Sequence, residues 1–379
     1  GLVGMILVRD EVEVAGGLPT RYGINEFPII IQDKTFDDNN QLEQSSFGRV
    51  LMVNATIDPY LEVPAEIVRL RVLNGSNERG YYLGLTGGLL LHVVGTDGGL
   101  LDAPEAIDRI MISPGERLDL LVDLSDRSGS TLSLMSFAGD LVLENEALTV
   151  SPSEDLPLDR VNFELLELRV GDPTENAIQS IPEAIWTNQR PDENEANHRR
   201  TIRLTQDADP DAHFTLDGRT YDDHRIDQIV TLRATEIWTI ENETRSPHTF
   251  HIQGIQFYIL DRNGLPPAAN EAGKKDTVLI NPLETVRFIA TFEDFSDTEA
   301  PYMYYCHILP HGDVGMMGQF LVVDAAQQHL SPSLHDRELV LRWPETLSRK
   351  FYQLEAALDL SEFSPLDTEF SLVDGMNEV

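Results

Sequence analysis

The fold of this chain can be worked out from the stretch IVRLRVLNGS (67–76). It alternates apolar and polar side chains and is rich in β-branched residues, which is the pattern of a strand with one face in a core. Its last three residues, Asn-Gly-Ser, favour a turn. The stretch EIWTIENET (236–244) has the same form, and its asparagine, Asn242, lies 168 positions after Asn74.

Two further pairs of segments match at this offset or nearly so. MISPGERLDLLVDLS (111–125) resembles LINPLETVRFIATFE (279–293), and their prolines, Pro114 and Pro282, are again 168 positions apart. HVVGTDGGLL (92–101) resembles FYILDRNGLP (257–266). Three matches in register predict two similar domains in tandem.

The remaining pattern is that of an all-β protein. Short apolar runs such as 27–32, 118–124 and 286–291 are separated by Gly, Pro, Asn and Asp, and no long amphipathic helix is evident. We expect tandem Greek-key β-sandwiches at 28–170 and 201–325. The polar segment 171–200 predicts a linker with one helical turn, and 326–379 a β-rich extension. GLVGMILVRD (1–10) is interpreted as the last strand of an upstream domain, with 1–27 its remnant.

Charge excludes some partners. The chain has 64 acidic and 28 basic residues, a formal net charge of −36. Such a surface repels nucleic acid and anionic lipid, so no nucleic-acid partner is expected. No apolar stretch is long enough to span a bilayer. The single cysteine, Cys306, excludes an intrachain disulfide.

The stretch YYCHILPHGDVGMMGQF (304–320) carries candidate metal ligands. Cys306, His311 and Met316 are spaced five and five, and SPHTFHIQG (246–254) supplies His248 upstream. Two imidazoles and a thiolate with a weak axial thioether form the ligand set of a blue-copper site. The spacing therefore predicts a mononuclear copper centre.

Other interpretations of these residues remain open. Each alone is more often a core or loop residue than a ligand. Zinc would accept Cys and His, but thioether is a poor zinc ligand, so Met316 favours copper. Met317 is an alternative axial ligand, although alternation along a strand should turn only one of the two inward. Asp261 and Asp276 are interpreted as solvated strand-end charges rather than site groups.

With these segments in view, the sequence resembles the multicopper oxidases, in the laccase-like bacterial branch with three cupredoxin domains. The resemblance runs from residue 1 to about 324 and is most specific in HTFHIQGIQFYILDRNGLPPAANEAGKKDTVLI and YMYYCHILPHGDVGMMGQFLVV. FPIIIQDKTF and VRLRVLNGSNERGYYLGL resemble the second domain, and GLVGMILVRD the final strand of the first. It implies a cupredoxin fold, with type 1 copper on His248, Cys306, His311 and Met316.

The sequence departs from the family's pattern at the oxygen-reducing trinuclear cluster. In the family, a Cys–His dipeptide relays electrons from type 1 copper to a cluster held by eight histidines, four of them from the first domain. His251 and His307 fall on cluster positions, and Cys306–His307 on the relay, so Cys306 and His307 are the candidate catalytic residues. Gln253 and Tyr305 stand where the family has histidine, and neither is a good substitute for imidazole on copper.

The function implied is a copper-dependent oxidoreductase whose type 1 copper takes electrons from a small molecule or a metal ion, with an incomplete cluster. One alternative is a blue-copper electron-transfer module that reduces an acceptor protein. Another is a copper-free structural or interaction protein on the same frame, as in the family's cell-division scaffolds. A periplasmic or secreted location is expected, with any export signal preceding residue 1. Substrate and oligomeric state are not readable from the sequence.

Overall fold

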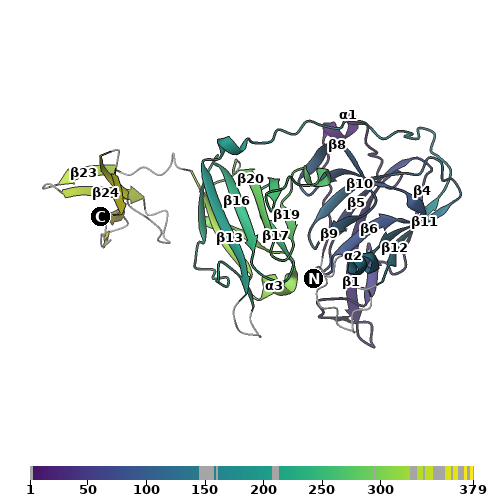
Figure 1. The fold of residues 1–379 in the computed structure, drawn as a ribbon, viewed down its shortest axis with the longest axis horizontal. Coiled ribbons are helices and arrows are strands. Elements are labelled where there is room, and N and C mark those ends of the chain that lie inside the picture. Colours follow the sequence, from purple (N-terminus) through teal and green to yellow (C-terminus); the bar gives the residue numbers. More distant parts are fainter. Residues whose placement is uncertain are drawn as a thin grey trace.

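Two β-sandwiches lie side by side in the computed structural model (Figure 1). The structure describes residues 3–144, 158, 161–206, 213–293 and 295–324, together with six short strands between Ser331 and Glu378. Of the predicted extension 326–379, the parts between those strands lie outside the described residues.

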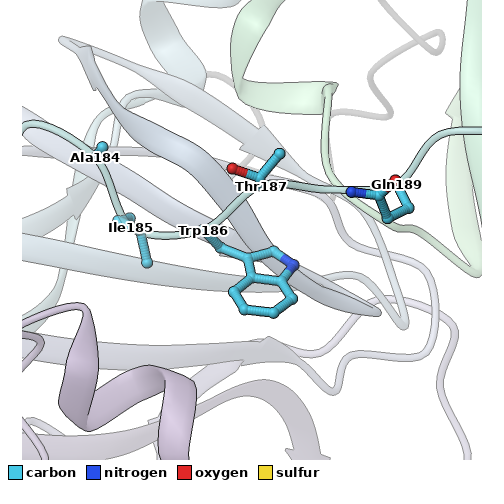
Figure 2. A pocket seen from close by; sticks show the side chains of 5 residues that line it. All are labelled: Ala184, Ile185, Trp186, Thr187 and Gln189. Carbon is cyan, nitrogen blue, oxygen red and sulfur yellow. The ribbon is translucent and has the colours of Figure 1, made fainter.

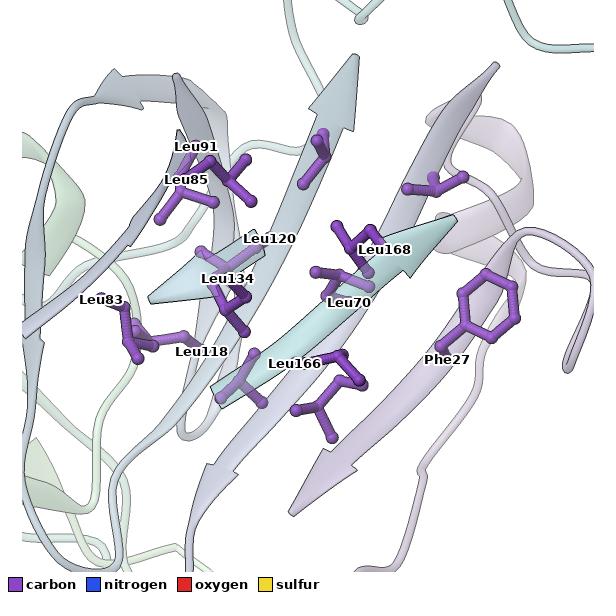
Figure 3. Close-up of a cluster of buried hydrophobic side chains, with 14 of the residues drawn as sticks. Phe27, Leu70, Leu83, Leu85, Leu91, Leu118, Leu120, Leu134, Leu166 and Leu168 are labelled. Atoms are coloured by element: carbon purple, nitrogen blue, oxygen red, sulfur yellow. The ribbon is translucent and has the colours of Figure 1, made fainter. Parts of the chain in front are cut away.

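The first sandwich fills most of residues 26–170. One sheet contains β1 (Glu26–Phe36), β2 (Leu42–Glu43), β3 (Val50–Val53), β5 (Ile67–Asn74), β7 (Leu91–Thr96), β8 (Gly99–Ile107) and β10 (Arg117–Asp123). The other contains β4 (Tyr60–Val63), β6 (Tyr81–Leu85), β9 (Ile110–Ile112), β11 (Thr131–Ser136) and β12 (Phe163–Val170). Alternate side chains of both sheets, such as Leu70, Leu120, Leu134 and Leu168, meet in one apolar core (Figure 3).

The second sandwich repeats this plan. Its first sheet contains β13 (His198–Gln206), β14 (Phe214–Leu216), β16 (Thr235–Asn242), β18 (Phe257–Arg262) and β20 (Thr285–Thr291). Its second contains β15 (Gln228–Thr231), β17 (His248–Ile252), β19 (Thr277–Ile280), β21 (Asp297–Cys306) and β22 (Met317–Val323). The core is aromatic around Trp238, which Phe288, Phe292, Tyr304 and Phe320 surround.

Strand pairing confirms the all-β fold and shows the repeat in three dimensions. β1 runs parallel to β5, β5 antiparallel to β10, and β10 antiparallel to β7. The second sandwich has the same order and directions in β13, β16, β20 and β18. Even the turns agree, because Asn74 accepts through Oδ1 from the Ser76 amide and Asn242 from the Thr244 amide, at 3.0 and 2.9 Å.

Helices are few and short among the described residues: α1 (Glu11–Ala15), α2 (Ala138–Glu144) and α3 (Leu309–Asp313). No helix in the described ranges has the length and apolar character to cross a membrane. The expected helical turn of the linker is η3 (Glu193–Glu195), after which β13 begins at His198.

The amino-terminal segment differs from expectation. Residues 3–10 form no strand, and Gly1 and Leu2 lie outside the described residues. A strand needs the backbone of a neighbour to complete its hydrogen bonds, and none of the described strands pairs with this segment. It is held instead by side chains, since Arg9 pairs with Glu26 and donates to the Thr20 carbonyl.

Ion pairs join the two sandwiches. Arg117 of the first donates two hydrogen bonds, of 2.7 and 2.6 Å, to the carboxylate of Asp276 in the second. Lys275 is 3% exposed and lies 3.0 Å from Asp97 and 3.2 Å from Glu116. Burial alone would lower the pKa of Lys275, but these two carboxylates raise it above its usual value, so the amine stays charged.

Candidate metal centre

The predicted ligands His248, Cys306 and His311 meet at one end of the second sandwich. His248 begins β17, Cys306 ends the adjacent β21, and His311 lies on α3, which follows Cys306. The Cys306 Sγ atom is 3.7 Å from Nδ1 of His248 and 3.5 Å from Nδ1 of His311, and the two Nδ1 atoms are 3.2 Å apart.

These three distances fit a metal ion at the centre of the triangle. Imidazole nitrogen and thiolate sulfur bind first-row ions such as zinc at about 2.0–2.3 Å, and trigonal angles then give edges of about 3.5–3.8 Å. The observed edges of 3.2–3.7 Å are close to these values. Within the described ranges, this is the one group of three or more His, Cys, Asp or Glu side chains with ligand atoms close enough to share an ion.

Thr244 favours one tautomer of His248. Its hydroxyl has a single proton, which Asn242 Oδ1 at 2.8 Å or the Ser246 carbonyl at 3.0 Å can accept. Its oxygen, 2.9 Å from His248 Nε2, then accepts the imidazole proton. The lone pair of His248 is therefore on Nδ1, facing Cys306 and His311, as a metal ligand requires.

Burial keeps both imidazoles neutral. It lowers the pKa of His248 to about 3, with a smaller contribution from His311, and the pKa of His311 to about 4. Burial also raises the pKa of the Cys306 thiol to about 12. A metal ion must therefore displace one proton, from sulfur, to bind here at neutral pH.

The two neighbouring methionines differ in their surroundings. Met316 is fully buried in the core that contains Cys306, and its carbonyl accepts from the Cys306 amide at 3.0 Å. Met317 is half-buried and lines a separate polar pocket, together with Tyr304 and with charged residues such as Asp217. The position of Met316 therefore suits the axial ligand better than that of Met317.

Phe214 covers the two histidines. Its ring centroid is 4.6 Å from that of His248 and 4.5 Å from that of His311. Phe214 is half-buried on β14, so it separates the rings from solvent on this side. Neither Phe214 nor Thr244 was identified from the sequence, although Thr244 stands only four residues before His248.

The residues at the cluster positions are arranged differently. Ring centroids of His251 and His307 are 5.8 Å apart, and Tyr305 lies 5.1 Å from His251 and 5.7 Å from His307. Gln253 is exposed. Burial, and then the charge of Asp276, raise the pKa of Tyr305 above its usual value, so its phenol stays protonated and is a poor metal ligand.

His251 is held by protein groups at one of its two ring nitrogens. Its Nδ1 lies 3.0 Å from both the Asp276 carbonyl and Thr277 Oγ1. Burial would raise the pKa of Asp276, but hydrogen bonds from Arg117 and then His251 hold it well below its usual range. Asp276, expected to be a solvated charge, is thus part of the contact between the sandwiches, while Asp261 forms an ion pair with Arg287.

A surface hollow lies away from these histidines, along the linker. Ala184, Ile185, Trp186, Thr187 and Gln189 line it, and the Trp186 ring is half exposed (Figure 2). None of these side chains is titratable or a good metal ligand, so we place no reaction chemistry there.

Comparison with known families and solved structures agrees with the fold. Two family models, both described as multicopper oxidase, match residues 29–137 and 193–326. The solved structure of McoA multicopper oxidase from Aquifex aeolicus is 33% identical, with a TM-score of 0.73 over 84% of this chain and 71% of that one. A laccase-like multicopper oxidase, CueO, from Ochrobactrum sp. is 30% identical, with a TM-score of 0.71 over 83% and 70%.

Curated relatives carry a different name. Cell division protein FtsP of Pectobacterium atrosepticum is 33% identical over 343 residues, which is 86% of this chain and 67% of the relative. FtsP of Escherichia coli K12 is also 33% identical, over 85% of this chain and 66% of the relative. The chain thus spans about two thirds of the length of these relatives.

Proposed function

This chain belongs to the multicopper oxidase family, and we propose that it binds one type 1 copper ion and uses it to take up single electrons. The observation that carries the proposal is the triangle of His248 Nδ1, His311 Nδ1 and Cys306 Sγ, with edges of 3.2–3.7 Å. Met316, buried beside it, would be the weak axial ligand. Copper in such a site supplies a one-electron acceptor.

The residues around the site prepare it for that ion. Thr244 holds the His248 proton on Nε2 and leaves Nδ1 free. Phe214 keeps water from one side of the imidazoles. His311 remains partly exposed, so an electron donor can approach the site through its ring edge.

The residues do not fit a complete oxygen-reducing cluster. Tyr305 stays a neutral phenol and Gln253 is exposed, so two of the positions where the family has histidine offer no imidazole. We therefore propose that a small molecule or a metal ion donates the electrons and that an acceptor protein receives them. The acidic surface and the type of copper site support a location outside the cytoplasm.

A second candidate function follows from the curated relatives. They are named cell division proteins, so this chain could serve as a copper-free structural or interaction protein. The presence of all four type 1 ligand residues favours the copper-binding proposal, because a frame without metal has no need of a thiol and two imidazoles facing one another.

Copper titration distinguishes the two. We expect the purified chain to bind one copper ion with an intense thiolate-to-copper absorption and a type 1 EPR spectrum. Cys306→Ser should lose both while keeping its fold by circular dichroism. Oxygen uptake with an added electron donor should stay at background. Absence of the blue absorption in the unsubstituted chain would overturn the proposal in favour of the structural function.

A further inference from the structure

The turn 113–116 of the first sandwich touches the metal loop of the second. A Cβ atom placed on Gly115 would lie 2.6 Å from Cδ2 and Nε2 and 2.7 Å from Cε1 of His307. Three nearly equal distances put that Cβ over the face of the ring. Glycine at this position therefore leaves the room that the His307 ring occupies.

The internal repeat shows that backbone conformation alone does not demand this glycine. Gly115 has φ +82°, and its counterpart 168 positions later, Leu283, has φ +59° and is 67% exposed. Both turns are closed by a glutamate, since Glu116 accepts from the Ser113 amide at 2.8 Å and Glu284 from the Asn281 amide at 2.7 Å. A bulky residue thus occupies the same left-handed turn where no ring lies above it.

His307 links the turn to two candidate ligands. It follows Cys306 directly, and its amide donates to the carbonyl of Thr249, which follows His248, at 2.6 Å. Further along the loop, the Leu309 amide donates to the Asn77 carbonyl at 2.9 Å. The first sandwich, which contributes no ligand, therefore contacts the loop at two points between Cys306 and His311.

We infer that Gly115 is a positioning residue for the copper centre: it lets the first sandwich hold His307, and through it Cys306 and His248, at their spacing. This inference rests on the proposed function. It adds that the contact between the sandwiches positions the metal ligands, so that a substitution in the first sandwich should change copper affinity in the second.

The test compares Gly115→Ala with Gly129→Ala in the full chain. Gly129 has φ +75° in the same sandwich and nothing within 4 Å of a Cβ, so it carries the backbone strain without the contact. We expect Gly115→Ala to weaken copper binding about 10–100-fold, as loss of outer support for metal ligands does, and to shift the type 1 absorption. Gly129→Ala should do neither.

A second measurement needs no copper. Cys306 is the single cysteine of the chain and 2% exposed, so its reaction with dithiodipyridine reports the position of the loop. Gly115→Ala should speed this reaction several-fold relative to Gly129→Ala. In a His307→Ala background the same substitution should have no further effect, because the ring that it displaces is gone.

The outcomes separate the two proposals. Equal behaviour of Gly115→Ala and Gly129→Ala in both measurements overturns the inference, as does an equal effect of Gly115→Ala with and without the His307 ring. If the unsubstituted chain binds no copper but the thiol contrast appears, the proposed function falls and the support of Cys306 by Gly115 stands.

Discussion

Two groups of histidines lie on the same pair of strands, β17 and β21 with the loop after it, and they have opposite surroundings. His248 and His311 turn their Nδ1 atoms toward each other and toward Cys306. His251, three residues along β17, gives its Nδ1 to Asp276 and Thr277. The difference teaches that possession of a histidine is not enough, because a metal centre also needs further ligands beside the free nitrogen. His248 has Cys306 and His311 there, whereas the neighbours of His251 include the phenol of Tyr305.

The largest expected effect comes from removing one histidine of each group in turn. His248→Ala should abolish the blue absorption, because the trigonal set loses a ligand and Phe214 cannot replace it. His251→Ala should keep the absorption, since this ring is not part of the triangle. Both are measured by visible and EPR spectra after copper addition. Equal loss in both variants would show that the two groups act as one centre.

The second largest expected effect is the pH dependence of copper affinity. Cys306, with a pKa of about 12, is protonated throughout pH 5–8, whereas His248 and His311, with pKa values of about 3 and 4, are already neutral. Binding then releases one proton, so affinity should rise about tenfold per pH unit, roughly a thousandfold over this range. Competition with a chelator of known pH dependence measures it. A slope near two would mean that an imidazole also loses a proton.

Thr244→Val tests the support of His248. Loss of the hydroxyl at Nε2 should weaken copper binding about 10–100-fold, because the tautomer is no longer fixed. Ser76→Ala is the matched control: Ser76 occupies the corresponding turn of the first sandwich, where its hydroxyl is 2.7 Å from that of Tyr81 and meets no imidazole. It should alter thermal stability but not affinity. A similar loss of affinity in both variants would contradict the role of Thr244.

Asp276→Asn should have the smallest effect on copper and act on stability instead. It breaks the pair with Arg117 and should lower the free energy of unfolding by about 1–3 kcal/mol, less than a fully buried pair because Arg117 is partly exposed. Because the pKa of Asp276 is depressed in the folded state, this stabilisation is present above about pH 4 and is lost as pH falls. Denaturant unfolding measures it.

The control for Asp276→Asn is Glu193→Gln, which removes a pair with Arg287 whose carboxylate is more exposed than that of Asp276, and it should cost less than about 1 kcal/mol. If Asp276→Asn also eliminated the type 1 spectrum, the group around His251 would have to be counted as part of the metal centre.

The sequence predicted what periodicity and spacing encode. Strand alternation and the 168-residue offset predicted both sandwiches, and the run from Cys306 to Met316 predicted the loop that carries the candidate ligands. Contacts between segments that are distant in the sequence could not be predicted from it. No sequence pattern around Gly115 predicts its contact with His307, which lies nearly two hundred positions later. Phe214 was not predicted either, because no metal-binding motif precedes it. The fate of residues 3–10 was also missed, because an apolar run predicts a strand only where a partner strand exists.

The burial of Cys306 has a consequence for how easily the metal-free protein is oxidised. Burial raises the pKa of this thiol to about 12, so far less of it is thiolate at pH 7 than in an ordinary exposed cysteine. Since the thiolate is the form that oxidants attack, newly folded protein should tolerate an oxidising compartment for a long time.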